Sequence, residues 1–293
     1  MDRPSRDYLL AGKRAGARYA LLAPKRAPLG PTGTHLANRP GSSLEFMDHR
    51  AYHAGDDLRH IDWSAYARTD RLSIKLYRQE INPHVDLLLD GSRSMDLTGT
   101  AKAEAALGLA ALLATAAEGA GFAHRAWIGT ERWQPVPNGT ADPAAWGPIA
   151  LEAVRNPDEA VLGSPPRLAP RGMRFLLSDL LWLGDPSAVL ARLADGACRL
   201  VVLQVLARAD ADPPPSGNTR LVDCESGQER EVFADAAALE RYRHRLGRHQ
   251  QHWHRAARQV GATLATVVAE NLIAGGWDVQ DLVAEGILEV SHR

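Results

Sequence analysis

The residues best suited to chemistry in this sequence are three oxygen-bearing side chains that follow a short apolar segment. Val85 to Leu89 is apolar apart from one aspartate, which is typical of a buried strand. Asp90, Ser92 and Ser94 come directly after it and alternate along the chain. Gly91 lets the backbone turn sharply, so all three side chains can point toward one place beyond the strand end. Hard oxygen ligands at the carboxyl end of a parallel strand suit Mg²⁺ or Mn²⁺.

The same residues also have a simpler interpretation. Asp-Gly-Ser is common in turns and helix caps, and a D-x-S-x-S pattern arises often by chance. The metal hypothesis therefore depends on structural context. That context is favourable here, because a predicted strand precedes the motif and a helical pattern comes after it.

A second carboxylate occupies a similar position later in the chain. Met173 to Leu177 is another short apolar segment, and Asp179 follows it closely. A carboxylate just past a buried strand repeats the position of Asp90, which makes Asp179 a candidate ligand. A helix cap is the alternative interpretation, and both stay open.

A dense cluster of polar side chains lies ahead of the first apolar strand. One hypothesis is a metal or acid–base centre built from His49, His53, Asp57 and His60. The alternative is a network of arginine–carboxylate pairs that holds a lead segment onto the main domain. We favour the network, because the cluster contains no recognised ligand spacing such as H-E-x-x-H. Its predicted members are Arg50, Asp56, Asp57, Arg59, Asp62 and Arg68.

Composition excludes several classes of protein. A net charge of −1, with 45% hydrophobic and 24% charged residues, is typical of a globular protein without a global field for nucleic acid. The basic helix expected over Asp235–Val260 is better explained as a solvated face. Cys198 and Cys224 fit no zinc or redox spacing. No apolar run is long enough for a membrane span and no signal peptide is evident, so we expect a cytoplasmic protein.

Strand and helix patterns alternate from residue 84 to residue 290, which predicts an α/β fold with a mostly parallel, doubly wound sheet and helices on both faces. We expect a lead segment over residues 1–80 and the main domain over residues 81–293. The predicted helices are Asp7–Leu22, Ala101–Gly119, Pro143–Val154, Pro186–Ala194, Asp235–Val260 and Val279–Glu285. The later predicted strands are His124–Ile128, Gln134–Val136, Arg199–Leu206 and Thr263–Val268, with an edge hairpin over Thr219–Cys224 and Glu229–Phe233.

Several unusual short motifs occur in one order between about residues 40 and 95. They are Glu45-Phe46, Arg50-Ala-Tyr52, Gly55-Asp56-Asp57-Leu58-Arg59, Ile61-Asp62-Trp63, Ala67-Arg68-Thr69 and Leu87-Leu88-Leu89-Asp90-Gly-Ser92-Arg-Ser94-Met95. With these motifs the chain resembles the family called domain of unknown function 58. Members of that family resemble von Willebrand factor A domains and often accompany MoxR-type AAA+ ATPases.

The resemblance implies a metal-ion-dependent adhesion site (MIDAS) at D-x-S-x-S. In A domains the later aspartate holds the ion through water, which would be the role of Asp179. A threonine from a middle loop is a further ligand, and Thr140 is the best placed here, with Thr130 second. Many relatives carry membrane helices ahead of this region, whereas this chain shows none.

Three functions remain open at this level. The first is a non-enzymatic, metal-dependent protein-binding module, an adaptor or chaperone partner of a MoxR-type AAA+ ATPase, with Mg²⁺ or Mn²⁺ as its ion. The second is a metal-dependent hydrolase that uses the His/Asp cluster of residues 49–62. The third is a metal-free scaffold. We favour binding over catalysis, because the chain has neither a G-x-S-x-G nucleophile motif nor a phosphate-binding loop.

Overall fold

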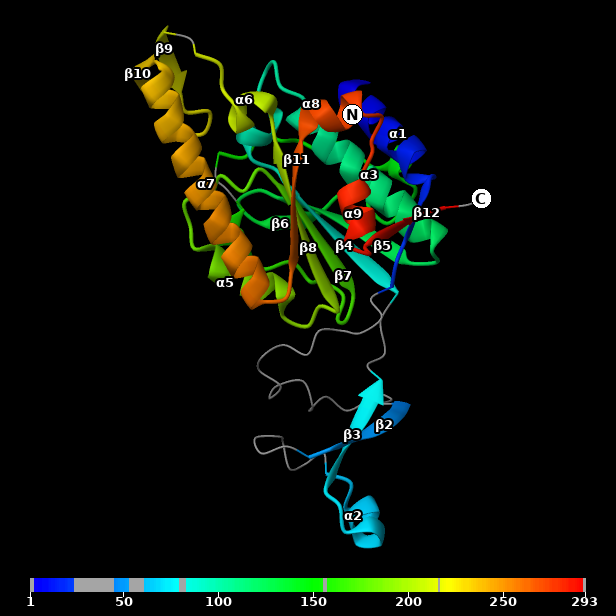
Figure 1. Cartoon of the computed structure of the whole chain (residues 1–293). Coiled ribbons are helices and arrows are strands. Elements are labelled where there is room, and N and C mark those ends of the chain that lie inside the picture. The colour runs from blue at the N-terminus through cyan, green and yellow to red at the C-terminus, as the bar shows by residue number, and fades with distance from the viewer. Residues whose placement is uncertain are drawn as a thin grey trace.

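The centre of the molecule is a six-stranded sheet, seen in a computed structural model that describes residues 3–23, 45–52, 61–78, 83–154, 157–215 and 217–291. Its strands, from one edge to the other, are β11 (Thr263–Val268), β8 (Arg199–Leu206), β7 (Met173–Ser178), β4 (His84–Asp90), β5 (Ala123–Gly129) and β6 (Trp133–Pro135). Neighbouring strands are parallel except β5 and β6 (Figure 1). The carboxyl ends of β4, β7 and β8 therefore lie at one edge of the sheet, which we call the carboxyl edge.

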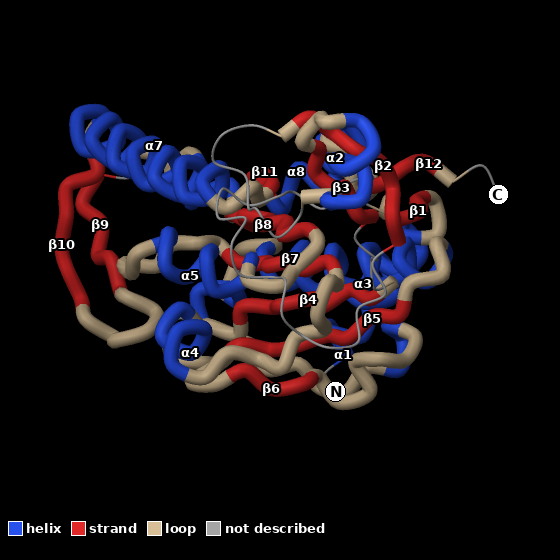
Figure 2. Tube along the Cα trace, turned by 90° about the horizontal axis from the view of Figure 1, so that it is seen from below, coloured by secondary structure: helices blue, strands red, loops and turns tan. Residues whose placement is uncertain are grey.

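Helices cover both faces of this sheet (Figure 2). Leu87 and Leu89 of β4 pack into one apolar cluster, whereas Leu88 packs into another, as the alternation of strand side chains requires. The first cluster includes residues from α1 (Arg3–Gly16), α3 (Lys102–Gly119), α8 (Ala269–Ala274) and α9 (Gln280–Ala284). The second includes residues from α4 (Asp158–Gly163), α5 (Pro186–Ala194) and α7 (Ala236–Gln259). The short helix α6 (Arg208–Ala211) follows β8 at the carboxyl edge.

The N-terminal helix belongs to the main core. Leu9 of α1 is fully buried there, and the two helices α1 and α3 cross with Gly12 against Gly108. A Cβ atom on Gly12 would lie 1.9 Å from the Gly108 carbonyl oxygen, so only glycine permits this approach. We expected the lead segment to fold onto the main domain, and Leu9, Ala15, Tyr19 and Leu21 of this segment contribute to the main core.

Outside the central sheet, the described residues form three antiparallel strand pairs. β1 (Tyr19–Leu21) pairs with β12 (Leu288–Val290), which brings the first and last described parts of the chain together. β9 (Gly217–Val222) and β10 (Glu229–Ala234) form a hairpin. β2 (Glu45–Ala51) pairs with β3 (Ser73–Arg78), and α2 (Trp63–Thr69) lies between them in sequence.

Most predicted elements are confirmed. α5, β8 and β11 have the predicted boundaries, and β6 returns against β5 as a hairpin. The prediction of a helix over Pro143–Val154 is wrong. Only a 3₁₀ turn forms, over Pro143–Ala145 and capped by Asp142. Gly147 and Pro148 come soon after it, and they disfavour continuation of a helix. No helix of the described ranges is both long enough and apolar enough to cross a bilayer.

Candidate binding site at the carboxyl edge

Asp90 is the buried acid at the end of β4, with 1% of its surface exposed. Its Oδ1 accepts a hydrogen bond from the Ser92 amide at 2.9 Å. Its Oδ2 accepts from the Ser178 hydroxyl at 2.6 Å and from the Trp182 indole at 3.1 Å. Burial and the charge of Asp179 raise the pKa of Asp90, while the hydrogen bonds from Ser178 and Ser92 oppose the rise. The Ser92 side chain also bonds to this carboxylate, so Asp90 is held by several donors at once.

The two serines of the motif lie side by side at the same edge. Ser92 Oγ and Ser94 Oγ are 2.9 Å apart. The Arg93 amide, between the two serines, donates to the Ala153 carbonyl. The Gly91 amide, just before them, donates to the Gly129 carbonyl at the end of β5. A Cβ atom on Gly91 would lie 2.6 Å from the Gly129 carbonyl oxygen, so glycine is required there.

Asp179 follows the adjacent strand, β7, and is 1% exposed. Its Oδ1 accepts from the Leu181 amide at 3.1 Å, and Gln204 of β8 donates to its backbone carbonyl at 2.9 Å. Because β4 and β7 are parallel neighbours, Asp90 and Asp179 lie at the same edge and their charges interact. The structure therefore brings together Asp90, Ser92, Ser94 and Asp179 at the carboxyl edge.

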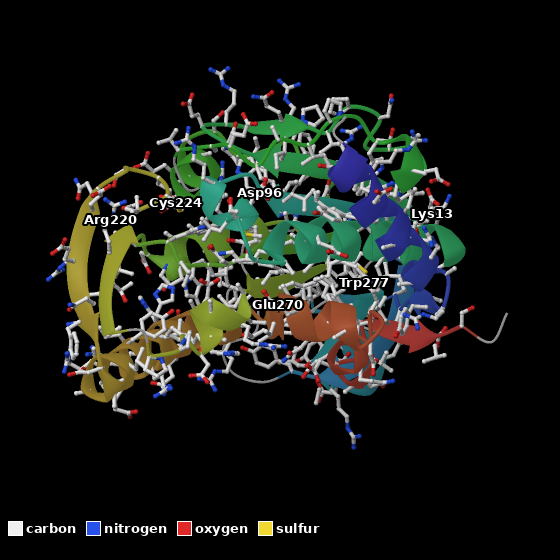
Figure 3. The ribbon with its side chains drawn as sticks, turned by 90° about the horizontal axis from the view of Figure 1, so that it is seen from above. Lys13, Asp96, Arg220, Cys224, Glu270 and Trp277 are labelled. Carbon is white, nitrogen blue, oxygen red and sulfur yellow. The ribbon has the colours of Figure 1, made fainter. Side chains whose placement is uncertain are left out.

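A fully buried lysine also lies at this edge. Lys102, the first residue of α3, places its Nζ 2.9 Å from Asp179 Oδ2 and 3.2 Å from Asp210 Oδ2. Burial alone would lower the pKa of Lys102, but the two carboxylates outweigh it and raise the pKa. The ammonium group therefore stays charged. A second contact also fixes the start of α3, because the Ala101 amide donates to the carboxylate of Glu270 in α8. Glu270 is labelled in Figure 3.

The β9–β10 hairpin brings a further acid toward the carboxyl edge. Cys224 lies at the hairpin end that is turned towards the sheet (Figure 3). The next residue, Glu225, is half-buried. Burial, followed by the charges of Asp179, Asp223, Asp90 and Asp158, raises the pKa of Glu225 to about 7. The edge thus carries more carboxylates than its lysine neutralises.

A pair of packed tryptophans lies beside Asp90, and one of them contacts it. Trp182 donates to Asp90 and packs edge-to-face against Trp253 of α7, with ring centroids 5.4 Å apart. Both indoles are 1% exposed. Leu180, which directly follows Asp179, has a left-handed backbone with φ of 55°. Strained backbone of this kind is concentrated at functional sites in proteins.

The donor set fits a divalent ion held mainly by hydroxyls. In a Mg²⁺ octahedron with bonds of about 2.0–2.1 Å, neighbouring oxygens are about 2.9 Å apart, which is the Ser92–Ser94 separation. Without an ion, the same separation is a hydrogen bond. Within the described ranges no three carboxylate, imidazole or thiol groups gather closely enough to hold an ion by themselves. Asp90 and Asp179 would therefore act through bound water.

The structure does not bring Thr140 to this edge. Because β6 runs antiparallel to β5, the chain returns toward the amino end of the sheet before it reaches Thr140. The flanking carbonyls of Gly139 and Ala141 contact the amino half of β5, and Thr140 itself is exposed. Thr130 directly follows β5 and is at the correct end, where its hydroxyl donates to the Arg132 carbonyl at 3.1 Å.

Little of the predicted polar network can be placed. His53, Asp56, Asp57, Arg59 and His60 lie outside the described residues, as do the side chains of His49 and Arg50. Asp62 is buried and caps α2, since its carboxylate accepts from the Ser64 and Ala65 amides. Arg68 is exposed in the last turn of α2. The network therefore stays a prediction.

Sequence reasoning missed Lys102, Ser178 and Trp182. Ser178 precedes Asp179 at a strand end, so its position was a usable signal. Lys102 opens an alanine-rich helix, where a lysine is ordinarily solvated, and no spacing rule connects it with Asp179. Trp182 likewise has no motif of its own.

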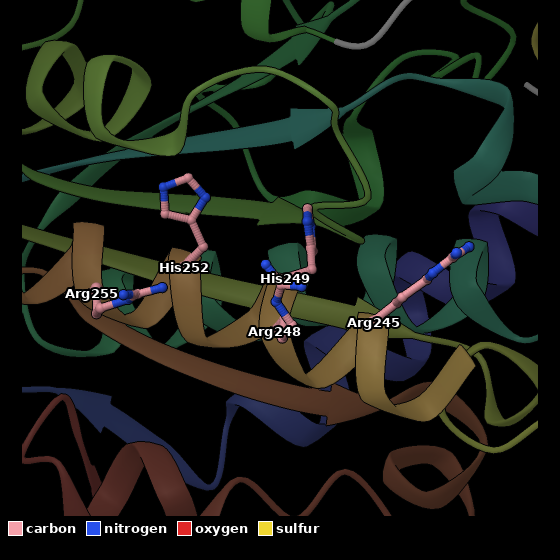
Figure 4. Close-up of a pocket in the computed structure, with 5 residues that line it drawn as sticks. All are labelled: Arg245, Arg248, His249, His252 and Arg255. Carbon is pink, nitrogen blue, oxygen red and sulfur yellow. The ribbon is translucent and has the colours of Figure 1, made fainter. Parts of the chain in front are cut away.

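A surface hollow lies elsewhere, along α7. It is lined by Arg245, Arg248, His249, His252 and Arg255 (Figure 4). Only His249 connects it to the edge, since its Nε2 lies 2.6 Å from the Leu180 carbonyl oxygen. The carboxyl edge is the better candidate site, because it combines buried charges with convergent hydroxyls.

Two solved structures resemble this chain weakly. An aerotolerance-related membrane protein from Bacteroides fragilis has 14% identity and a TM-score of 0.38, and the match covers 70% of this chain and 98% of that one. The conserved hypothetical protein BatB from Bacteroides thetaiotaomicron has 12% identity and a TM-score of 0.35, with coverages of 69% and 98%. These scores are too low to carry an argument about function.

Sequence comparison gives a firmer assignment. Uncharacterized proteins of Mycobacterium bovis and Mycobacterium tuberculosis are each 27% identical over 262 residues, which cover 80% of this chain and 78% of each relative. The family model described as "Protein of unknown function DUF58" matches residues 48–252, a range that contains Asp90, Ser92, Lys102 and Asp179. The chain is therefore a member of the DUF58 family.

Proposed function

We propose that this chain is a non-enzymatic, von Willebrand A-like protein-binding module whose carboxyl edge binds a carboxylate of a partner protein through a divalent ion. The observation that supports it is the convergence of Ser92, Ser94, Asp90 and Asp179 at the ends of two adjacent parallel strands. Ligands of open parallel sheets bind outside this edge.

The chain's own residues have separable tasks in this proposal. Ser92 Oγ and Ser94 Oγ are the direct protein ligands, and Asp90 and Asp179 orient bound waters. Ser178 and Trp182 hold the Asp90 carboxylate in one orientation. Bound Mg²⁺ or Mn²⁺ would supply positive charge and an open coordination position at the protein surface.

Charge explains why an acidic group of the partner would be attracted. Ion ligation by two neutral hydroxyls leaves most of the ion's charge available, whereas ligation by several carboxylates would neutralise it. Few protein ligands also imply weak binding, with a dissociation constant roughly in the micromolar to millimolar range.

For the partner we propose a MoxR-type AAA+ ATPase, which rests on the family resemblance alone and is an analogy. The test is a pull-down of this ATPase from the same organism with the wild-type chain, with and without chelator. We expect chelator and Asp90→Ala to weaken capture to a similar level.

Asp142→Ala is the matched control, because Asp142 caps a turn on the loop that leads away from the edge. Its capture should stay dependent on the ion, as for the wild type. If neither chelator nor Asp90→Ala reduces the amount of ATPase captured, the proposal is contradicted.

A further inference from the structure

Lys102 is an unusual residue for its place. It is 0% exposed at the first position of α3, and cations are disfavoured at helix N-termini. Burial of an ammonium group is costly unless it is well paired. The structure supplies this pairing through Asp179 at the end of β7 and Asp210 in α6.

Both carboxylates that hold Lys102 are fixed independently of it. Asp179 accepts from the Leu181 amide through Oδ1, the oxygen that does not contact Lys102. Asp210 accepts from the Ala207 amide at 3.0 Å. The ammonium therefore has a defined position among the ends of β7, β8 and the start of α3, and it contacts one of the predicted ion-site acids directly.

We propose that the Lys102 ammonium is a resident cation of the carboxyl edge, which neutralises Asp179 and thereby limits the affinity of the edge for a divalent ion. This inference deepens the proposed function and rests on its placement of the ion at Ser92 and Ser94. The consequence is an ion that binds weakly and exchanges readily, so that binding of the partner stays reversible.

The physical basis is repulsion between like charges at a buried site. Lys102 and a divalent ion both draw on Asp179, and the effective dielectric constant there is well below that of water. Replacement of Lys102 by an uncharged side chain removes the repulsion and frees one Asp179 oxygen. A purely structural lysine would behave differently, since its loss would reduce stability and leave ion affinity unchanged.

The test is the affinity of the full chain for Mn²⁺, measured by electron paramagnetic resonance of the free ion. Lys102→Gln keeps a hydrogen-bond donor for Asp179 but removes the charge. We expect it to bind Mn²⁺ at least about tenfold more tightly than the wild type. Lys102→Arg keeps the charge and should bind like the wild type. Lys13→Gln, which removes an exposed ion pair with Asp142, should change nothing.

The outcomes separate this inference from the proposed function. Binding by Lys102→Gln but not by the wild type would support the resident cation and contradict an ion bridge in the native protein. Equal binding by both would overturn the inference and leave the bridge intact, and no binding by either would overturn both. If Lys102→Gln does not fold alone, recovery of folding with millimolar Mn²⁺ supports the inference and failure of recovery overturns it.

Discussion

Lys102 and Asp179 form a buried ion pair, with Nζ 2.9 Å from Oδ2, although 77 residues separate them in sequence. Each side chain is 1% exposed. The pair connects the start of α3 with the end of β7. It therefore holds these two elements together at the carboxyl edge and also sets the charge of that edge.

Loss of Lys102 should therefore be costly to stability. We expect Lys102→Gln to lower the free energy of unfolding by about 3–5 kcal/mol in the absence of ions, because it leaves buried carboxylates without their cation. Urea unfolding in chelator measures this. The control is Lys13→Gln, which removes an exposed pair with Asp142 and should cost about 0–1 kcal/mol. If both substitutions lower the free energy of unfolding equally, the claim that the Lys102 pair is buried and stabilising is contradicted.

Ser178 and Trp182 should be energetically coupled, because both donate to the same oxygen of Asp90. We expect Ser178→Ala and Trp182→Phe each to lower the free energy of unfolding by about 1–3 kcal/mol, since each removes a donor from a buried carboxylate. A double-mutant cycle should give a coupling energy above about 0.5 kcal/mol. Strict additivity would show that the two donors act independently.

Asp86 lies on the same strand as Asp90, away from the site, and should make the stability of the fold depend on pH. Burial alone would raise its pKa, but hydrogen bonds from His84, Trp127 and the Ala169 amide outweigh it and lower the pKa below 3.8. The ionised form thus stabilises the fold above pH 3.8, and this contribution is lost as pH falls through the lower folded pKa. We expect Asp86→Asn to cost about 1–3 kcal/mol at pH 7 and less at pH 3, by urea unfolding. A difference that is constant between these pH values would refute the assignment.

The ionised Glu225 side chain should lower the stability of the fold when no ion is bound. Its carboxylate lies in the field of Asp179 and Asp90, so neutralisation relieves repulsion. We expect Glu225→Gln to raise the melting temperature in chelator and to weaken Mn²⁺ binding modestly. Glu231→Gln, on exposed β10, is the control and should leave both unchanged. A lower melting temperature for Glu225→Gln would contradict the repulsion.

Much of this architecture could be predicted from local sequence. The β-branched run of β8 and the Asp-Pro start of α5 gave correct boundaries, because burial and capping act within a few residues. Asp90 and Asp179 were predicted to meet, since the carboxyl ends of neighbouring parallel strands lie at one edge of a sheet.

The errors have long-range causes. Thr140 was misplaced because the reversal of direction at β6 depends on sheet pairing. Lys102 was missed because its partners lie 77 and 108 residues away, and neither its type nor its neighbours indicate burial. The helix predicted from Pro143 is the exception, since Gly147 and Pro148 are local signals against a helix.

The most direct test of the ion site is calorimetric titration of Mn²⁺ into the wild-type chain and into Ser92→Ala. Ser92 Oγ is a direct ligand in our proposal, and no other described hydroxyl lies within hydrogen-bond distance of Ser94 Oγ to replace it. Ser187→Ala, on α5, controls for loss of a serine hydroxyl away from the edge. We predict weak, saturable binding to the wild type and to Ser187→Ala, and its loss in Ser92→Ala. Equal binding by wild type and Ser92→Ala would contradict the central claim that this edge holds the ion.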